Sequence, residues 1–498
     1  MPRTIRTGSA GRGGGGGAAF FAEPREPEPD ARAAGAAVRA RVDGAAARVA
    51  VEDGRAAMIL TVAARGLPGR EPAPVGCVSV TGDTAVRRRP HRSAPACGRA
   101  RVAAAVGAGW DARGMEHVSA DQVRRYRVRA QQLDREPDAG RAGTDAAVLD
   151  AGVQDTGPDG ALWALAVRGV PARAGAWPDD LALVWSVRGA PHAYRRGDLP
   201  AVQRALRPYS DADAGRRIYD AAKPLRAAGI RPVDALAHVA RTMHAVVGEP
   251  TPKGELSTRM TAELDEPYLR WCRPCGATHM FEMPFRLGAL HAGLELEPGT
   301  SPSVLRRSPG FPPAQVGAVD RGGDGAGAAD DAPDEAAHDL VRGVLHLLGP
   351  ATPKDVAAFL DAPVADVKRR WPADAVPVDV EGVTASVLAD DLPALLGTGT
   401  GDGERVVRLL GPHDLFLQAR DRHVLVPDPA RATALWPVLG RPGAVLADGE
   451  VVGTWRPRAR GRRLALELDP WLPWDAALER AVAEQHERLA AFRGADPA

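Results

Sequence analysis

Cysteines are scarce in this sequence, and long apolar runs are absent from it. Four cysteines among 498 residues do not make a disulfide framework, so a reducing cytoplasm is the expected compartment. No stretch approaches about 18 uninterrupted apolar residues, so no transmembrane helix is predicted. The N-terminus carries arginines but lacks the apolar segment and small-residue cleavage site of a secretory signal. We therefore expect a cytoplasmic protein with no membrane partner.

Positive charge is concentrated at the N-terminal end. Residues 1–114 hold 18 arginines, no lysine and 10 acidic residues, which gives a net charge of +8. Because the whole chain has a formal net charge of +1, residues 115–498 carry a net charge of −7. Affinity for a nucleic-acid backbone comes from lysines and arginines that displace counterions. Any nucleic-acid contact of the acidic part therefore requires local basic patches.

The composition of residues 1–114 predicts a disordered, low-complexity extension. Residues 11–17 are glycines with one arginine, and proline alternates with glutamate from Glu23 to Asp30. Such a composition buries too little apolar surface to offset the entropy of an ordered chain. The first well-patterned segment follows Met115, where we expect the natural start of translation.

Beyond this extension, the pattern favours a winged helix. Ser119 and Gln122 form a capping box, after which apolar residues recur at helical spacing as far as Leu133. Further helices are predicted at 144–149 and 161–167, followed by strands at 181–187 and 192–194. Three helices followed by a hairpin is the order of a winged helix, whose second and third helices form a helix-turn-helix.

An internal repeat predicts two more such units. Seven residues recur 101 positions later: Arg241, Val246, Val247, Gly248, Thr251, Pro252 and Lys253 return as Arg342, Leu347, Leu348, Gly349, Thr352, Pro353 and Lys354. In each copy a helix ends at the glycine, and Thr-Pro is suited to the N-cap and first position of the next helix. Strand-rich stretches follow at 268–296 and 376–388. Chance similarity over so few positions is the alternative to a duplicated helix-turn-helix.

The C-terminal region has the pattern of a small barrel or sandwich. Strands are predicted at 406–410, 415–418, 423–426, 444–447 and 464–468, with a hairpin turn at Asp448-Gly449 and a final helix at 474–492. The expected fold class is α+β, with tandem winged-helix (helix-turn-helix) domains followed by a small C-terminal β-barrel. The expected domains are the extension 1–114, winged helices 115–209, 210–300 and 335–400, a linker at 301–334, and the barrel with its C-terminal helix at 401–498.

A polar segment between two apolar helices, Gly-Val-Gln-Asp-Thr-Gly-Pro at 152–158, holds the candidate catalytic residues. By itself it predicts a loop in which Asp155 or Thr156 caps the next helix. In an extended backbone, Gln154 and Thr156 would share one face while Asp155 points away. In a tight turn, Asp155 would join them.

This segment, followed by Ala-Leu-Trp-Ala-Leu at 161–165, resembles the start of the bacterial winged-helix DNA glycosylases that unhook interstrand crosslinks. Trp185, Arg188, Gly189 and His192 resemble that family's Trp-x-x-Arg-Gly-x-x-His hairpin. Residues 410–414 with the arginine-rich turn 420–422 resemble its Pro-aromatic-Asp segment, and 447–456 resemble the closing hairpin of its barrel. The segments follow the family's order from about Ser119 to Trp474, which is more specific than any one of them.

The resemblance implies three winged helices and a β-barrel arranged around duplex DNA. It also implies a monofunctional DNA glycosylase, a hydrolase of DNA repair that removes alkylated or crosslinked bases. The family's motif is Gln-x-Gln or Gln-x-Asp, and Gln154 matches its first position. Thr156 stands where an amide or carboxylate is expected, with Asp155 one place early. The reaction requires an oriented water and a stabilised oxocarbenium-like sugar, tasks suited to a carboxylate beside an amide.

Basic residues in and beside the predicted units are the candidate DNA contacts. They are Arg124, Arg127, Arg188, His192, Lys253, Arg259, Lys354, Lys368 and Arg420. A solvated helix face is the alternative for each group. We expect a monomer that binds double-stranded DNA and is associated with the nucleoid. Two other functions remain open: a non-catalytic winged-helix DNA-binding or regulatory protein, and a protein-interaction module.

A second candidate site is Cys272-x-x-Cys275 with His279 close behind. These are zinc-binding residue types, and His291 or Glu282 would complete a tetrahedron. Two unliganded thiols are the alternative, whereas a redox pair would require a thioredoxin-like context. We expect no cofactor to be required and structural zinc to be the metal that this motif allows.

Overall fold

The computed structural model describes residues 41–42, 45–52, 55–60, 114–157, 160–320, 338–398 and 405–498. By its internal contacts the chain divides into two units, Met1–Gly98 and Arg99–Ala498. The first unit contains an antiparallel sheet of β1 (Arg41–Val42), β2 (Ala45–Glu52) and β3 (Arg55–Leu60). These strands lie within the expected extension 1–114, and the Asp-Gly pairs at 43–44 and 53–54 are strong hairpin signals in the sequence. The other residues of 1–113 lie outside the described ones.

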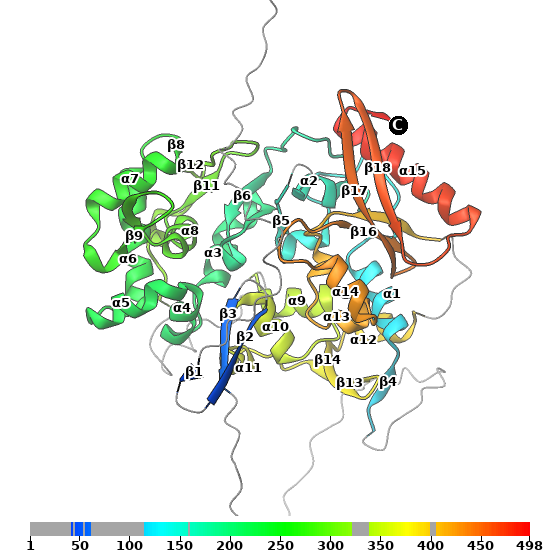
Figure 1. Ribbon diagram of the computed structural model, residues 1–498, viewed down its shortest axis with the longest axis horizontal. Coiled ribbons are helices and arrows are strands. Elements are labelled where there is room, and N and C mark those ends of the chain that lie inside the picture. Colours follow the sequence, from blue (N-terminus) through cyan, green and yellow to red (C-terminus); the bar gives the residue numbers. More distant parts are fainter. Residues whose placement is uncertain are drawn as a thin grey trace, which may run out of the picture. The chain divides into compact units, whose positions relative to one another are not determined.

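The second unit begins with α1, whose capping box is confirmed. The Oγ of Ser119 accepts a hydrogen bond from the Gln122 amide at 3.2 Å, and Gln122 Oε1 accepts from the Ser119 amide at 3.0 Å. The first elements are β4 (Glu116–Val118), α1 (Ala120–Ala130), the 3₁₀ helix η1 (Ala147–Asp150), β5 (Val153–Gln154) and α2 (Gly160–Ala166). The helix expected at 144–149 is therefore only one 3₁₀ turn (Figure 1).

A six-stranded sheet joins the first two expected winged helices. Its order is β5-β7-β6-β11-β12-β8, with β6 (Leu181–Trp185), β7 (Pro191–Arg195), β8 (Thr251–Pro252), β11 (Leu294–Leu296) and β12 (Val304–Arg307). Every residue of β6 is buried, because its side chains enter two different apolar clusters. The strand β12 lies within the expected linker 301–334, so residues 304–307 of that segment belong to the folded sheet.

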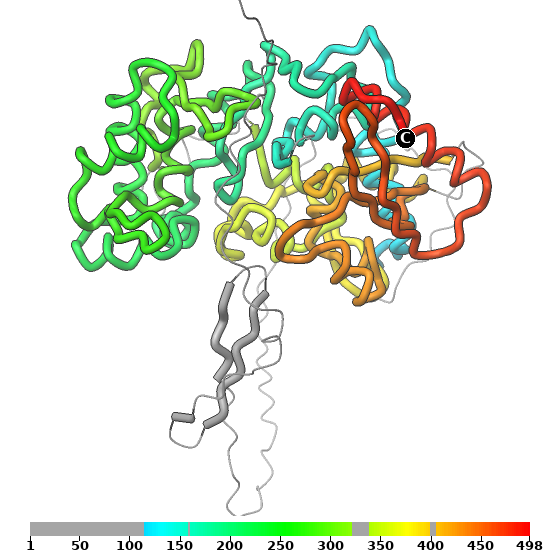
Figure 2. Tube along the Cα trace, turned by 45° about the horizontal axis from the view of Figure 1, so that its top comes forward, coloured from blue at the N-terminus to red at the C-terminus, as the bar shows by residue number. Residues whose placement is uncertain are grey.

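Helices dominate the segment between β7 and β11. They are α3 (Leu199–Leu206), α4 (Asp211–Arg217), α5 (Ala222–Ala227), α6 (Pro232–Val246), α7 (Lys253–Glu263) and α8 (Glu282–His291), with a hairpin of β9 (Leu269–Cys272) and β10 (Ala277–Met280) before α8. In both views this green segment forms one lobe of the second unit, and the C-terminal part lies on the other side (Figures 1 and 2). The stretch 268–296, expected to be strand-rich, contains α8 between its strands β10 and β11. Gly288 lets this helix pack closely on Val239 of α6.

The two copies of the repeat differ in how their second helix begins. In the second copy Thr352 caps α10 and forms a capping box with Asp355, as the sequence predicts. In the first copy Thr251 belongs to β8, and its hydroxyl donates to the Glu249 carbonyl instead. The second copy contains α9 (Leu340–Leu348), α10 (Pro353–Leu360), α11 (Val364–Arg369), the hairpin β13 (Ala375–Val380) and β14 (Val383–Leu388), and α12 (Leu392–Leu396). Strand β4 extends this hairpin by pairing parallel to β13.

The C-terminal region forms a five-stranded sheet in the order β15-β16-β17-β18-β19. Its elements are β15 (Val407–Leu410), η7 (Leu415–Gln418), α13 (Arg422–Leu425), α14 (Pro429–Leu435), β16 (Gly443–Ala447), β17 (Glu450–Arg460), β18 (Arg463–Pro470), α15 (Ala476–Arg493) and β19 (Asp496–Pro497). The Asp448-Gly449 turn is confirmed, since both residues have positive φ and Ala447 pairs with Glu450. The strands expected at 415–418 and 423–426 are helical instead. The expected α+β class is confirmed.

A buried ion pair connects these regions. Arg168, just after α2, donates to both carboxylate oxygens of Asp414 at 2.8 Å, and both side chains are 0% exposed. The same guanidinium donates to the backbone and side-chain oxygens of Gln131, whose amide donates to the Leu347 carbonyl. One apolar cluster likewise contains residues of the first expected unit, the third unit and the C-terminal sheet. These three regions therefore share one core.

Asp414→Asn is predicted to lower the free energy of unfolding by about 3–5 kcal/mol, because it leaves the Arg168 charge buried without a counter-ion. Denaturant unfolding monitored by circular dichroism measures the change. The control is Glu467→Gln, which breaks the exposed pair with Arg458 and should cost no more than about 1 kcal/mol. Equal effects of the two variants would contradict a structural role for the buried pair.

Candidate functional site

Gln154 and Thr156 lie side by side at the end of β5. The side-chain amide of Gln154 donates to the Thr156 hydroxyl at 3.0 Å. Gln154 pairs with His192 of β7, and the next amide, that of Asp155, donates to the Pro191 carbonyl at 2.8 Å. The backbone is therefore extended here, and of the two geometries that the sequence left open, the one that places Gln154 with Thr156 is observed.

Asp155 points to the other side and caps α2. Its Oδ1 accepts a hydrogen bond from the Ala161 amide at 2.9 Å. A Cβ on Gly160 would lie 1.9 Å from that oxygen, so this close approach requires glycine. Burial raises the pKa of Asp155, and the bond from Ala161 opposes that shift. The carboxylate therefore caps α2, which is one of the alternatives that the sequence left open for this residue.

A cavity of about 390 Å³ opens beside Gln154 and Thr156. This volume lies within the range of roughly 300–1,000 Å³ typical of small-molecule sites. Its walls come from the end of β5, from α2, from the loops 411–414 and 440–443, and from β17. The residues that line the cavity include Gln154, Thr156, Trp163, His413, Asp414, Arg441, Trp455, Arg456, Arg458 and Arg493.

The cavity has a positively charged lining. Four arginines contribute to it, of which Arg458 pairs with Glu467. Among the described residues that line the cavity, Asp414 is the only acid. That carboxylate is neutralised by Arg168. His413 adds no charge near neutral pH, because burial lowers its pKa and Arg441 and Arg188 lower it further. These arginines are therefore suited to contacts with phosphate groups of a nucleic acid, whereas Gln154 and Thr156 add no charge to the lining.

His192 pairs with Gln154 across the sheet, and its side chain is buried and inaccessible to a ligand. Its Nδ1 lies 2.9 Å from the Ser186 hydroxyl, which lies 3.1 Å from the Tyr194 hydroxyl. Burial lowers the pKa of His192 to about 3, so the imidazole is neutral at physiological pH. Since the side chain is buried within the protein, the expected DNA contact of His192 is corrected to a packing role.

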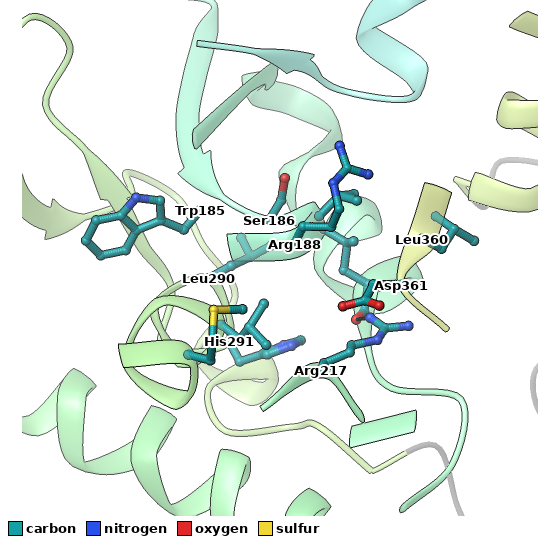
Figure 3. Close-up of a pocket in the computed structure, with 12 residues that line it drawn as sticks. Trp185, Ser186, Arg188, Arg217, Leu290, His291, Leu360 and Asp361 are labelled. Atoms are coloured by element: carbon teal, nitrogen blue, oxygen red, sulfur yellow. Dashed lines mark hydrogen bonds between the residues drawn. The ribbon is translucent and has the colours of Figure 1, made fainter. Parts of the chain in front are cut away.

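Arg188 also serves the protein interior. It has a positive φ of 59°, and its guanidinium donates to the Phe359 carbonyl and, at 2.7 Å, to Gln418. Figure 3 shows this guanidinium pointing away from Arg217 and Asp361. The cavity drawn there, of about 20 Å³, has room for little more than a water molecule. Arg188 therefore links the β6–β7 turn to α10 and η7, which corrects its expected DNA contact.

The remaining expected DNA contacts divide into engaged and exposed residues. Arg127 is fully buried and donates to Asp421 at 3.0 and 2.6 Å and to the Gly349 carbonyl, so it cannot meet a phosphate. Four others are partly enclosed or paired: Arg124 donates to the Val424 carbonyl, Lys253 pairs with Glu282, Arg259 pairs with Glu255, and Arg420 is half-buried. Lys354 and Lys368 are exposed on α10 and α11.

The structure brings together the three expected metal ligands. The donor atoms of Cys272, Cys275 and His279 all lie within 4.8 Å of one another. The two candidate fourth ligands are occupied elsewhere, since Glu282 pairs with Lys253 and Arg286 and His291 contacts Gln203.

The sequence did not indicate that two tryptophans, Trp163 and Trp455, line the cavity. The indole nitrogen of Trp163 donates to the Leu409 carbonyl at 2.8 Å, and that of Trp455 donates to the Leu410 carbonyl at 2.9 Å. The Arg168–Asp414 pair was also missed, although one cation in the apolar run 161–170 and one acid before the apolar run 415–417 were visible signals.

A comparison with known protein families covers the segment that forms this site. Residues 148–492 match the family model described as DNA glycosylase AlkZ-like, a range that includes β5, α2 and most of the pocket. The chain belongs to the AlkZ-like DNA glycosylase family. Membership confirms the resemblance read from the sequence, and it makes DNA repair the function and DNA the partner at the family level.

One solved structure supports the fold of this AlkZ-like chain. The DNA glycosylase AlkZ of Streptomyces sahachiroi is similar to it with a TM-score of 0.54 and 23% identity, over 76% of this chain and 98% of that chain. The search of curated proteins found no match to the present chain. In the described part of the chain, none of the helices has the length and apolar character needed to cross a membrane.

Asp155→Ala is predicted to lower the free energy of unfolding by about 0.5–2 kcal/mol, because it removes the cap of α2. Asp155→Asn should be close to neutral, since asparagine caps as well as aspartate. Thermal unfolding of both variants measures the difference. A strong loss of any base-release activity in a normally stable Asp155→Asn protein would instead assign the carboxylate to catalysis.

Proposed function

We propose that this protein is a monofunctional DNA glycosylase that hydrolyses the N-glycosidic bond of alkylated or crosslinked bases in double-stranded DNA. The observation that carries the proposal is the cavity of about 390 Å³ with Gln154 and Thr156 together on its wall. The likeness to a Streptomyces DNA glycosylase supports it. No cofactor is required in this proposal.

The pair is suited to hold the attacking water. Because one amide hydrogen of Gln154 is given to Thr156 Oγ1, the Gln154 carbonyl oxygen remains to accept a hydrogen from water. The Thr156 hydroxyl has a hydrogen left to donate to the water oxygen. The water oxygen would then bond to the sugar C1′ while the bond from C1′ to the base breaks. The bonding electrons leave with the base, and the water proton passes to solvent.

Among the described residues of the cavity wall, no carboxylate is available for catalysis, and this bears on the substrate class. Among the described residues that line the cavity, the one acid is already paired with Arg168. A purine alkylated at N7 or N3 is cationic and leaves as a neutral base without being protonated. A neutral base such as uracil lacks this advantage. We therefore infer that cationic, alkylated purines are the substrates.

The DNA-facing surface would combine hairpins and helix-turn-helix units. The helices α6 and α7 followed by β9–β10, and α9 and α10 followed by β13–β14, have the order expected of winged helices. With the first expected winged helix, 115–209, they would surround the duplex, and the C-terminal sheet would take the place of the family's barrel. The β17–β18 hairpin adds a row of arginines: Arg456, Arg458, Arg460, Arg462 and Arg463. We propose a monomer that acts in the cytoplasm on nucleoid DNA.

Thr156, at the position of the family's amide or carboxylate, favours one second function. It would suit a winged-helix DNA-binding protein that keeps the scaffold without the reaction. DNA binding without base release, by the wild-type protein and by Thr156→Gln, would favour that function.

Gln154→Ala is predicted to slow base release about a hundredfold or more while changing DNA affinity by no more than about threefold, since the amide acts on the transition state. Abasic sites formed in duplex DNA with one N7-methylguanine measure the rate, and uracil-containing and undamaged duplexes are controls. Thr156→Gln should raise the rate by restoring an amide pair. A Gln154→Ala protein as active as wild type would exclude the proposed role.

DNA binding is predicted to weaken with salt, with a slope of about −4 to −5 in a plot of log affinity against log salt, as expected for about four to six phosphate contacts. The double change Lys354→Glu and Lys368→Glu should make the slope shallower by about two. Lys223→Glu is the control, because this exposed lysine lies on α5, outside the helix-turn-helix pairs. A flat salt response of the wild-type protein would instead favour a protein-interaction module.

A further inference from the structure

We propose that Cys272, Cys275 and His279 bind a zinc ion at the tip of the β9–β10 hairpin. Their donor atoms all lie within 4.8 Å of one another. In a tetrahedral site with bonds of about 2.0–2.3 Å, ligand atoms are separated by roughly 3.3–3.8 Å. The observed cluster is therefore within about 1–1.5 Å of that geometry, a difference that side-chain rotation accommodates.

The hairpin places the three residues on one face. Cys272 pairs across the strands with Ala277, and His279 follows two positions later, so both strands direct these side chains to the same side. Cys275 lies in the connecting turn, and Gly276 after it has a positive φ of 60°. This glycine lets the chain reverse directly after the second cysteine, which keeps its thiol near the first.

The surroundings of the cluster match those of a metal site. The Nδ1 of His279 lies 2.8 Å from the Met280 carbonyl oxygen, to which it donates. Zinc-binding histidines commonly donate their other ring nitrogen to a carbonyl in this way, which leaves Nε2 for the metal.

The hairpin has a structural need for such a link. It forms a two-stranded sheet of its own. Its base packs on the apolar core through Leu269 and Met280, whereas residues 273–278 at its tip are exposed, and two-stranded hairpins gain stability from such packing. Its Trp271 is 66% exposed, so the strand contributes little apolar burial there. Zinc bound by the two cysteines and the histidine would fix both strands. Among the described residues no fourth protein donor joins the cluster, so water would occupy the fourth position.

A fixed hairpin has a consequence for DNA that rests on the proposed function. The hairpin follows α6 and α7, where a winged helix carries its wing. It presents Trp271 and Arg273 at the surface, residue types that contact nucleic-acid backbones and bases. Loss of zinc would loosen this wing while leaving the pocket at Gln154 intact.

The test measures metal in the full-length protein by inductively coupled plasma mass spectrometry after exposure to zinc and removal of excess metal. We expect about one zinc per chain. Cys272→Ser, Cys275→Ser and His279→Asn should each reduce the retained zinc at least tenfold. The matched control is the double variant Cys77→Ser and Cys97→Ser, which changes the other two cysteines and should retain zinc fully.

Hydrogen exchange keeps the test independent of how well the variants fold. On the wild-type protein, a zinc chelator should speed amide exchange in residues 269–280 and leave β5 and α2 unchanged. No retained zinc, zinc lost only in the Cys77 and Cys97 variant, or a Cys272–Cys275 disulfide in freshly purified protein would overturn the proposal. Neither readout uses base release, so a failure of the proposed glycosylase activity would leave this result distinct.

Discussion

The buried ion pair between Arg168 and Asp414 is the interaction on which the candidate site depends. Arg168 follows α2, and Asp414 begins η7, so the pair joins two walls of the cavity beside Gln154. A charge buried without its partner would cost several kcal/mol. The ion pair therefore holds these two walls of the cavity together. The same guanidinium bonds Gln131, and through it the pair extends to α9.

This constraint also shapes the chemistry. Because Asp414 is used for structure and Asp155 for capping α2, the amide of Gln154 and the hydroxyl of Thr156 remain as the polar pair on the cavity wall. An amide and a hydroxyl can orient water but supply no negative charge.

Local sequence patterns predicted the helix caps and the hairpin turn. They could not predict which distant segments pair with one another. The caps at Ser119 and Thr352 and the Asp448-Gly449 turn follow from residues within a few positions, and they are confirmed. The sheet that joins β6 to β11 pairs residues more than 100 positions apart, which no local periodicity records. Arg127 was expected on a DNA-facing surface because its partly buried partner, Asp421, lies 294 positions away in the sequence. At the site, the sequence offered two geometries, and only the pairing of β5 with β7 decided between them.

The most direct test of this account is the structure of the protein bound to duplex DNA that contains an abasic-site analogue. The account predicts that the sugar of the analogue enters the cavity, within hydrogen-bond distance of Gln154 and Thr156. It also predicts phosphates beside the arginines of β17, such as Arg456 and Arg458. A duplex bound to another face, with the cavity beside Gln154 empty, would contradict the central claim.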